Sequence, residues 1–258
     1  MIRLRQAPAR QVGKRAAIAL LLPLCAAAQE PIVMEAATQP AVGLNYLRTQ
    51  FLFRDLDGAD EYGLKTRYTR GVRYNVSINA ETEYTAGDES GLDDVKLFAK
   101  WRVLQNDLGP VDTLRGSLIG GAELPSGSRR SSDSFDPFFG GVVTTILGRN
   151  GFNADLIVQV NTAGGVEGDD KLSYDASWLY RIAPERWSAD TTASWYTVLE
   201  LNGNAWENGD HQLMITPGLL YEARSWAAEI GIHLPLTETM HDRPAEEFGL
   251  TAGVRYLF

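Results

Sequence analysis

Residues 73–84 read RYNVSINAETEY, and this stretch decides the fold. Apolar or small side chains occupy every second position from Tyr74 to Tyr84, while the positions between them, from Arg73 to Glu83, are polar or charged. Alternation with a period of two is typical of a β-strand that has one apolar and one polar face, and it does not fit the period of a helix. The stretch therefore predicts a two-faced strand.

The same alternation recurs along residues 43–258 and predicts twelve strands. Each is roughly 10–13 residues long, which is near the length that a tilted strand needs to cross a bilayer. The predicted strands span 43–54, 61–70, 73–85, 93–104, 112–124, 136–148, 151–162, 171–183, 188–201, 211–222, 226–236 and 247–258. Pro217 lies inside one of them and predicts a bulge or a local kink there, because proline cannot donate to the sheet.

A soluble β-sandwich also alternates, but two features favour a membrane barrel. The polar faces carry charges in mid-strand, such as Lys100, Arg115, Asp155 and Arg181, and the apolar faces end in Tyr and Trp. Aromatic girdles of this kind mark the two interfaces of transmembrane barrels. Lipid also forbids an open sheet edge, so the sheet must close. The fold prediction is all-β: a single closed antiparallel transmembrane β-barrel of about 12 strands.

The connections between the strands predict which end faces which compartment. Short links alternate with longer polar links, and short periplasmic turns with longer outer loops are the outer-membrane pattern. With an even number of strands, both termini are expected to be periplasmic. The longer links span 55–60, 86–92, 125–135, 163–170, 202–210 and 237–246, and most of them are acidic.

Residues 1–28 read as a secretory signal peptide. Five basic residues precede the apolar run 16–24, which leads to Ala26-Ala27-Ala28. The alternative is a lipoprotein that is lipidated at Cys25, but the residue before Cys25 is Leu24, where a small residue is expected. Without the leader, 19 of the 24 basic residues remain against 33 acidic ones, a net charge of −14. Such an acidic chain is unsuited to nucleic acid, and one Cys excludes a disulfide framework.

Residues 29–42 do not alternate. They are expected to form either a loose periplasmic segment or a plug inside the barrel, and residues 43–258 form the barrel itself. The last strand ends in Tyr256 and Phe258, with apolar side chains at alternate positions. This ending resembles the assembly signal of bacterial outer-membrane barrels, which implies the barrel-assembly machinery as a partner.

Several stretches in a fixed order carry a wider resemblance. They are 91–97 followed by Lys100-Trp101-Arg102, then 122–127, 216–219, 234–236 and 253–258. In these stretches the chain resembles the outer-membrane barrels named after the MetA pathway of phenol degradation, which are often called transporters. The resemblance implies passage of small, hydrophobic or aromatic compounds. It brings no catalytic residues, no cofactor and no metal.

The predicted lumen face carries many charges of both signs. Structural cross-strand ion pairs and a selectivity lining are both compatible with such a mixture. The candidate lumen residues are Arg73, Glu81, Glu83, Lys96, Lys100, Arg102, Arg115, Glu123, Asp155, Asp175, Arg181, Asp190, Glu200, Glu229, His233 and Arg255.

An enzymatic barrel is the competing class. A barrel lipase needs a Ser nucleophile beside a His base. His233 is predicted to face the lumen with Glu229 four residues earlier, but the inward positions on the neighbouring strands offer Thr216 and Thr251 and no Ser. His233 is therefore interpreted as a polar lumen residue.

The sequence thus predicts an exported outer-membrane barrel without enzymatic activity that lets a small compound diffuse passively. Outer-membrane lipids and lipopolysaccharide are its expected surroundings, and the acidic outer loops either bridge to lipopolysaccharide through cations or are simply solvated. The alternatives are a non-conducting structural or adhesion barrel and, behind it, a lipid-modifying enzyme.

Overall fold

The computed structural model describes residues 29–87, 90–109, 111–163, 168–188 and 190–258. The predictions of a signal peptide and of a lipid on Cys25 lie outside these ranges, as do the acidic loop residues Asp88, Glu89 and Glu167. The strands are β1 (Asn45–Leu56), β2 (Ala59–Arg73), β3 (Val76–Ala86), β4 (Gly91–Asp93), β5 (Val95–Asp107), β6 (Thr113–Leu124), β7 (Arg129–Arg130), β8 (Asp136–Leu147), β9 (Asn150–Gln159), β10 (Lys171–Ala183), β11 (Ala193–Trp206), β12 (His211–Ala223), β13 (Trp226–Thr239) and β14 (Glu246–Leu257).

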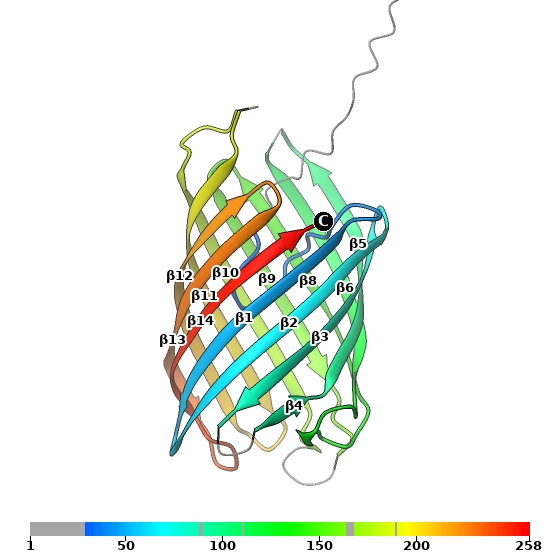
Figure 1. The fold of residues 1–258 in the computed structure, drawn as a ribbon, viewed down its shortest axis with the longest axis vertical. Helices are drawn as coiled ribbons and strands as arrows, with labels where there is room; N and C mark the ends of the chain where they lie inside the picture. The colour runs from blue at the N-terminus through cyan, green and yellow to red at the C-terminus, as the bar shows by residue number, and fades with distance from the viewer. Residues whose placement is uncertain (1–28, 88–89, 110, 164–167, 189) are drawn as a thin grey trace, which may run out of the picture.

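Twelve of these strands form one closed antiparallel barrel (Figure 1). The wall closes because β1 pairs with β2 on one side and with β14, the last strand, on the other. Of the two short strands, β4 pairs with one end of β3, and β7 pairs in parallel with β4. This architecture confirms the predicted closed barrel of 12 strands.

Hydrophobic and charged side chains are distributed inside out. In β5, Trp101 is 52% exposed whereas its neighbour Lys100 is 6% exposed, and in β14 Tyr256 is 54% exposed whereas Arg255 is 2% exposed. A soluble protein does not expose apolar surface on this scale. An apolar outer wall around a polar interior is the arrangement expected of a barrel in lipid.

Both chain ends of the barrel lie together, at the end that we call the terminal end. Asn45, at the start of β1, exchanges backbone hydrogen bonds with Phe258 there. The opposite end, which carries β4 and β7, is called the loop end (Figure 1). Which end faces the periplasm remains a prediction.

Two predicted lumen residues lie instead at the terminal rim. Arg73 is the last residue of β2, beside the turn at Tyr74-Asn75, and it is exposed. Asp190 precedes β11, which begins at Ala193 and not at the predicted residue 188, so Asp190 is exposed in the connection from β10. The alternating pattern ran past the true strand ends, where side chains meet solvent and no longer line the interior.

The first predicted long loop, 55–60, is in fact a tight hairpin. Strands β1 and β2 stay paired as far as Leu56 and Ala59, so only Asp57 and Gly58 form the turn. Gly58 has φ = +94°, a backbone conformation that glycine adopts without strain.

Pro217 interrupts one seam of the wall. Its pairing with Leu199 of β11 is retained, but between β12 and β13 the paired positions stop at Ile215–Leu234 and resume at Gly218–Gly231. The register is the same on both sides of the gap. The proline therefore causes a local defect in the ladder without a bulge at that position, because it lacks the N–H that would bond to β13.

The connection 125–135 is fastened to the loop end by Asp94. The Asp94 carboxylate accepts hydrogen bonds from the backbone N–H of Ser126 (2.9 Å), Gly127 (2.8 Å) and Ser132 (2.9 Å) and from the Ser131 hydroxyl (2.7 Å). Burial raises the pKa of Asp94, but these bonds outweigh it and hold the pKa below its usual value. A lowered pKa means that the ionised, bonded carboxylate persists from neutral pH down to about pH 4, and docking weakens only below that.

We predict that Asp94→Ala releases this connection. Removing the carboxylate leaves the turn N–H groups without their acceptor, so trypsin should cut after Arg129 or Arg130 several-fold faster than in the parent barrel at neutral pH. Asp133→Asn is the matched control, because Asp133 lies in the same connection, its backbone N–H donates to the Ser131 hydroxyl at 3.1 Å, and asparagine tolerates its φ of +54°. Equal cleavage rates for both variants would contradict the role of Asp94.

Candidate functional site: a lumen filled by residues 29–42

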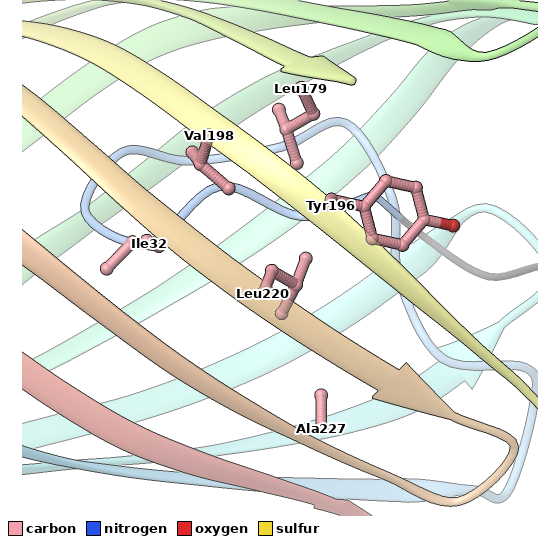
Figure 2. Packing of buried hydrophobic residues seen from close by; sticks show 6 residues of the cluster. All are labelled: Ile32, Leu179, Tyr196, Val198, Leu220 and Ala227. Atoms are coloured by element: carbon pink, nitrogen blue, oxygen red, sulfur yellow. The ribbon is translucent and has the colours of Figure 1, made fainter. Parts of the chain in front are cut away.

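Residues 29–42, which we call the plug segment, lie inside the barrel. Ile32 and Ala37 are fully buried and Met34 is 4% exposed, although the segment belongs to no strand. Figure 2 shows the coil that carries Ile32 running behind β11 and β12, within the wall. Glycines on the inner face make room for it: a Cβ at Gly71 would overlap the backbone of Pro40 and Ala41.

A single carboxylate anchors the middle of the plug segment. Glu200, which is fully buried on β11, accepts hydrogen bonds from three successive backbone N–H groups, those of Ile32, Val33 (3.0 Å) and Met34 (3.1 Å). Successive N–H groups that converge in this way form a concave site for an anion. The chain thus bends around Glu200.

Two arginines and one glutamine hold the start of the plug segment. Arg48 and Gln50 bond to Glu229, at 2.7 and 2.9 Å, and also to the carbonyl oxygens of Pro31 and Ile32. Arg255 bridges the same Glu229 and the Glu30 carboxylate, the latter at 3.3 Å. The buried Glu229 therefore orients the side chains that grip the segment.

Glu35 fastens the other half of the segment to the opposite wall. Its carboxylate pairs with Arg67 and with Lys100, the latter at 2.8 Å, and its backbone N–H donates to Asp155 at 3.0 Å. Two residues later, Ala37 donates to the hydroxyl of Thr144 at 2.8 Å. The lumen wall thus bonds both to the side chain of Glu35 and to the backbone of the segment.

Two apolar clusters support these polar contacts. In the first, Ile32 packs among Leu179, Tyr196, Val198, Leu220 and Ala227 of strands β10–β13 (Figure 2). In the second, Ala37 packs among Phe98, Ile119, Phe138 and Val142 of β5, β6 and β8. The inner face is therefore mixed, and part of it is as apolar as a protein core.

The plug segment borders two cavities inside the barrel. The smaller one, about 30 Å³, lies toward the terminal end between the plug segment and β1–β3 and has room for a couple of water molecules. The larger one, about 130 Å³, is the loop-side cavity; it has an apolar wall of Phe98, Ile119, Phe138 and Ile157. Glu35 and Arg67 line both cavities, so their ion pair forms the partition between them.

Fourteen of the sixteen candidate lumen residues are on barrel strands with inward or partly buried side chains, and most have a partner. Glu81 pairs with Arg67 at 2.5 Å, Glu83 with Arg54 at 2.7 Å, Lys96 with Glu123 at 3.6 Å and Arg115 with Asp107 at 4.0 Å. Arg102 donates to the carbonyl of Tyr74, and Arg181 lies over the Trp187 ring. Asp155 and Asp175 face each other across β9 and β10, and Asp175 accepts from Asn202 at 3.3 Å.

The residues that hold the plug segment were partly missed from sequence. Arg48, Gln50 and Arg67 occupy inward positions of β1 and β2, and extending the alternation to those strands finds them. Glu30 and Glu35 have no such signal, because the segment that carries them is irregular. Their position inside the lumen depends on the three-dimensional fold alone.

His233 does not bond to Glu229 in the way that the sequence suggested. Its ring lies between two hydroxyls, with Thr251 at 2.6 Å and Thr216 at 3.3 Å, whereas Glu229, the acid proposed to orient it, bonds to Arg48 and Arg255. Among the residues that the structure describes, no three or more His, Cys, Asp or Glu side chains are grouped to hold a metal ion. Within the same ranges there is no helix long and apolar enough to cross a membrane.

Comparison with known proteins supports the fold. No family model and no curated protein sequence matches the chain. Among solved structures it is similar to the COG4313 outer membrane channel from Pseudomonas putida F1, with a TM-score of 0.55, 14% identity and coverage of 87% of this chain and 98% of that one. The NanC porin matches with a TM-score of 0.52 and 12% identity, over 81% of this chain and 98% of that one. LpxR from Salmonella typhimurium matches with a TM-score of 0.50 and 9% identity, over 83% of this chain and 100% of that one.

Similarity at these identities shows the fold alone. The chain has the closed barrel fold of outer-membrane channel and porin structures. The resemblance to the phenol-degradation family is not confirmed, because no family model matches.

Glu229→Gln should destabilise the barrel strongly. The substitution leaves the buried Arg48 and Arg255 without their shared carboxylate, and breaking a buried pair from one side costs about 3–5 kcal/mol. Urea unfolding of the barrel in lipid vesicles measures the change. Glu185→Gln is the control: its pair with Arg149 spans 3.9 Å with Glu185 84% exposed, so little change is expected. A similar, small effect for both would mean that Glu229 is not a structural anchor.

Glu200→Ala should release the plug segment without opening the barrel wall. In a Cys25→Ser background, a cysteine placed by Ala37→Cys is buried and should react slowly with a water-soluble maleimide; adding Glu200→Ala should speed the reaction several-fold, because three backbone N–H groups lose their acceptor. Glu123→Gln is the control, since Glu123 bonds to Lys96 and Gln159 and not to the plug segment. Unchanged labelling after Glu200→Ala would refute the anchoring role.

Proposed function

We propose that the protein is an outer-membrane channel through which a small compound diffuses passively, and that the plug segment closes it. The observation that carries the proposal is the lumen itself: a barrel wide enough to hold an irregular peptide, which is bound by non-covalent contacts to side chains of the wall. Displacing that peptide would leave a continuous passage along the lumen of the twelve-stranded barrel.

The lining supports a small solute with apolar character. Phe98, Ile119 and Phe138 face the loop-side cavity, while ion pairs cover much of the remaining wall. The two solved channels of similar fold are described as an outer membrane channel and a porin, which agrees with transport of some kind. The motif order shared with the phenol-degradation barrels favours a hydrophobic or aromatic compound.

In this proposal the terminal end faces the periplasm, because most of the short turns and both ends of the barrel lie there. The exposed outer wall contacts outer-membrane lipid, the loop end meets lipopolysaccharide, and Tyr256 and Phe258, whose rings stack at 5.7 Å on the outer surface, serve the barrel-assembly machinery.

The same contacts favour a second candidate, a structural barrel. Many of its lumen charges form ion pairs, and Ile32, Ala36 and Ala37 of the plug segment are buried as completely as core residues. In that case the interior is a filled core that never opens, and the outer surface or the loops carry the function.

Conductance across a planar bilayer separates the two candidates. The intact barrel should show small steps, and Glu200→Ala or deletion of residues 29–41 should raise the conductance several-fold, while Glu123→Gln should leave it close to that of the parent. Uptake of phenol into liposomes should rise in the same order. If the deleted barrel is folded, as shown by heat-modifiable gel mobility, yet remains silent, the structural candidate stands and the channel does not.

A further inference from the structure

The loop-side cavity has the size and the wall of an aromatic site. Phe98 and Phe138 meet edge to face, with ring centroids 5.8 Å apart, and Ile119 and Ile157 extend their surface. The volume of about 130 Å³ is close to that of an engineered apolar cavity of about 150 Å³ that binds benzene. The apolar group that fits this cavity is therefore a single six-membered aromatic ring.

Most charges around this cavity are already neutralised. Glu81 is held by Arg67 and by Lys65 at 3.0 Å, and Glu35 is held by Arg67 and Lys100. On the far side Glu123 forms an ion pair with Lys96 at 3.6 Å and accepts a hydrogen bond from Gln159 at 2.9 Å. Each of the three acids Glu35, Glu81 and Glu123 is thus matched by at least one cation.

Lys171 is the exception. It is the first residue of β10, its side chain lines the cavity, and among the described residues its ammonium group has no ion pair and no hydrogen bond. The charged groups that act on it most strongly include three cations, Lys65, Lys96 and Arg243, and one anion, Glu123. An ammonium group held beside apolar side chains and further cations has an unfavourable free energy that an anion would relieve.

From this arrangement we propose that the loop-side cavity binds a monocyclic aromatic carboxylate. The ring packs on Phe98, Phe138, Ile119 and Ile157, and the carboxylate accepts a charge-assisted hydrogen bond from Lys171. Ser173, on the same face of β10, lines the cavity beside it, and its hydroxyl donates to the Asn204 amide oxygen at 2.8 Å. Arg67 lies over the Phe98 ring, 5.4 Å from its centroid, and closes the cavity toward the plug segment.

This inference rests on the proposed channel function, whose solute it narrows from an aromatic compound to an aromatic anion. It also gives a role to the ion pair of Arg67 and Glu35, which separates the two cavities. A solute bound at Lys171 would contact this ion pair before any other part of the plug segment.

The test is binding of phenylacetate to the barrel in phosphatidylcholine nanodiscs, measured by calorimetry. Phenylacetamide, which has the same shape without the charge, and acetate, which lacks the ring, are compared with it. Phenylacetate should bind at least tenfold more tightly than either, a difference of about 1.4 kcal/mol. Equal binding of acetate would reduce the cavity to a simple anion site, and equal binding of phenylacetamide would remove the role of Lys171; either result overturns the proposal, as does absence of binding.

Variants locate the charge. Lys171→Gln should abolish the preference for phenylacetate over phenylacetamide, and Lys171→Arg should retain it. Lys65→Gln removes the same charge from β2 at a side chain that does not line the cavity, so it should keep the preference; a loss as large as that of Lys171→Gln would refute a local contact. Should Lys171→Gln fail to fold by heat-modifiable mobility, Lys171→Arg and the three ligands on the parent barrel decide the matter.

The binding site and the channel function can be refuted independently. A barrel that binds phenylacetate but never conducts refutes the channel and keeps the site, whereas a barrel that conducts without this preference refutes the site and keeps the channel.

Discussion

The need to pair every backbone N–H and C=O group inside lipid governs this molecule. Hydrocarbon offers no partner for a free strand edge, so the first and last strands must meet, as β1 and β14 do from Tyr46–Leu257 to Leu56–Glu246. Closure then fixes the two environments: one face of every strand looks outward and the other into a confined interior. The one place where a residue cannot pair, Pro217, shows how small a defect is accepted, because its neighbours on β12 and β13 resume the same register.

Confinement explains the density of charge contacts in the interior. Strands β1, β2, β13 and β14 bring Arg48, Arg67, Glu229 and Arg255 into a space that the plug segment shares, and each of these four side chains forms an ion pair there. The irregular backbone at residues 30–37 is accepted there because Glu200, Arg255, Lys100 and Thr144 satisfy its polar groups in place of a sheet. An interior of this kind can be a permanent core or a closed passage, and the difference lies in how tightly the plug segment is held.

Alternation predicted the strands well where both faces were distinct, and less well at their ends. The stretches 171–183 and 211–222 correspond to β10 and β12 to within one residue. In contrast, 73–85 begins three residues before β3, and 188–201 was placed about five residues early, which put Asp190 in the lumen. Strand ends are decided by where neighbours stop pairing, and that is not written in the alternation. Leu179, Tyr196 and Phe98 also occupy inward positions, and their apolar character could not be interpreted until the plug segment was placed against them.

The sequence by itself determined the closed barrel, its number of strands and which face of each strand is polar and which apolar, because a period of two is a local property of the chain. It also determined that charges such as Lys100, Asp155, Glu200 and Arg255 turn inward. Only the tertiary structure decided that the plug segment fills the lumen and that Glu229 bonds to two arginines instead of His233. It also decided that Lys171 has no ion pair and no hydrogen bond within the part of the chain that the structure describes. These facts depend on contacts between residues more than a hundred positions apart, such as Ile32 and Glu200, which no local pattern encodes.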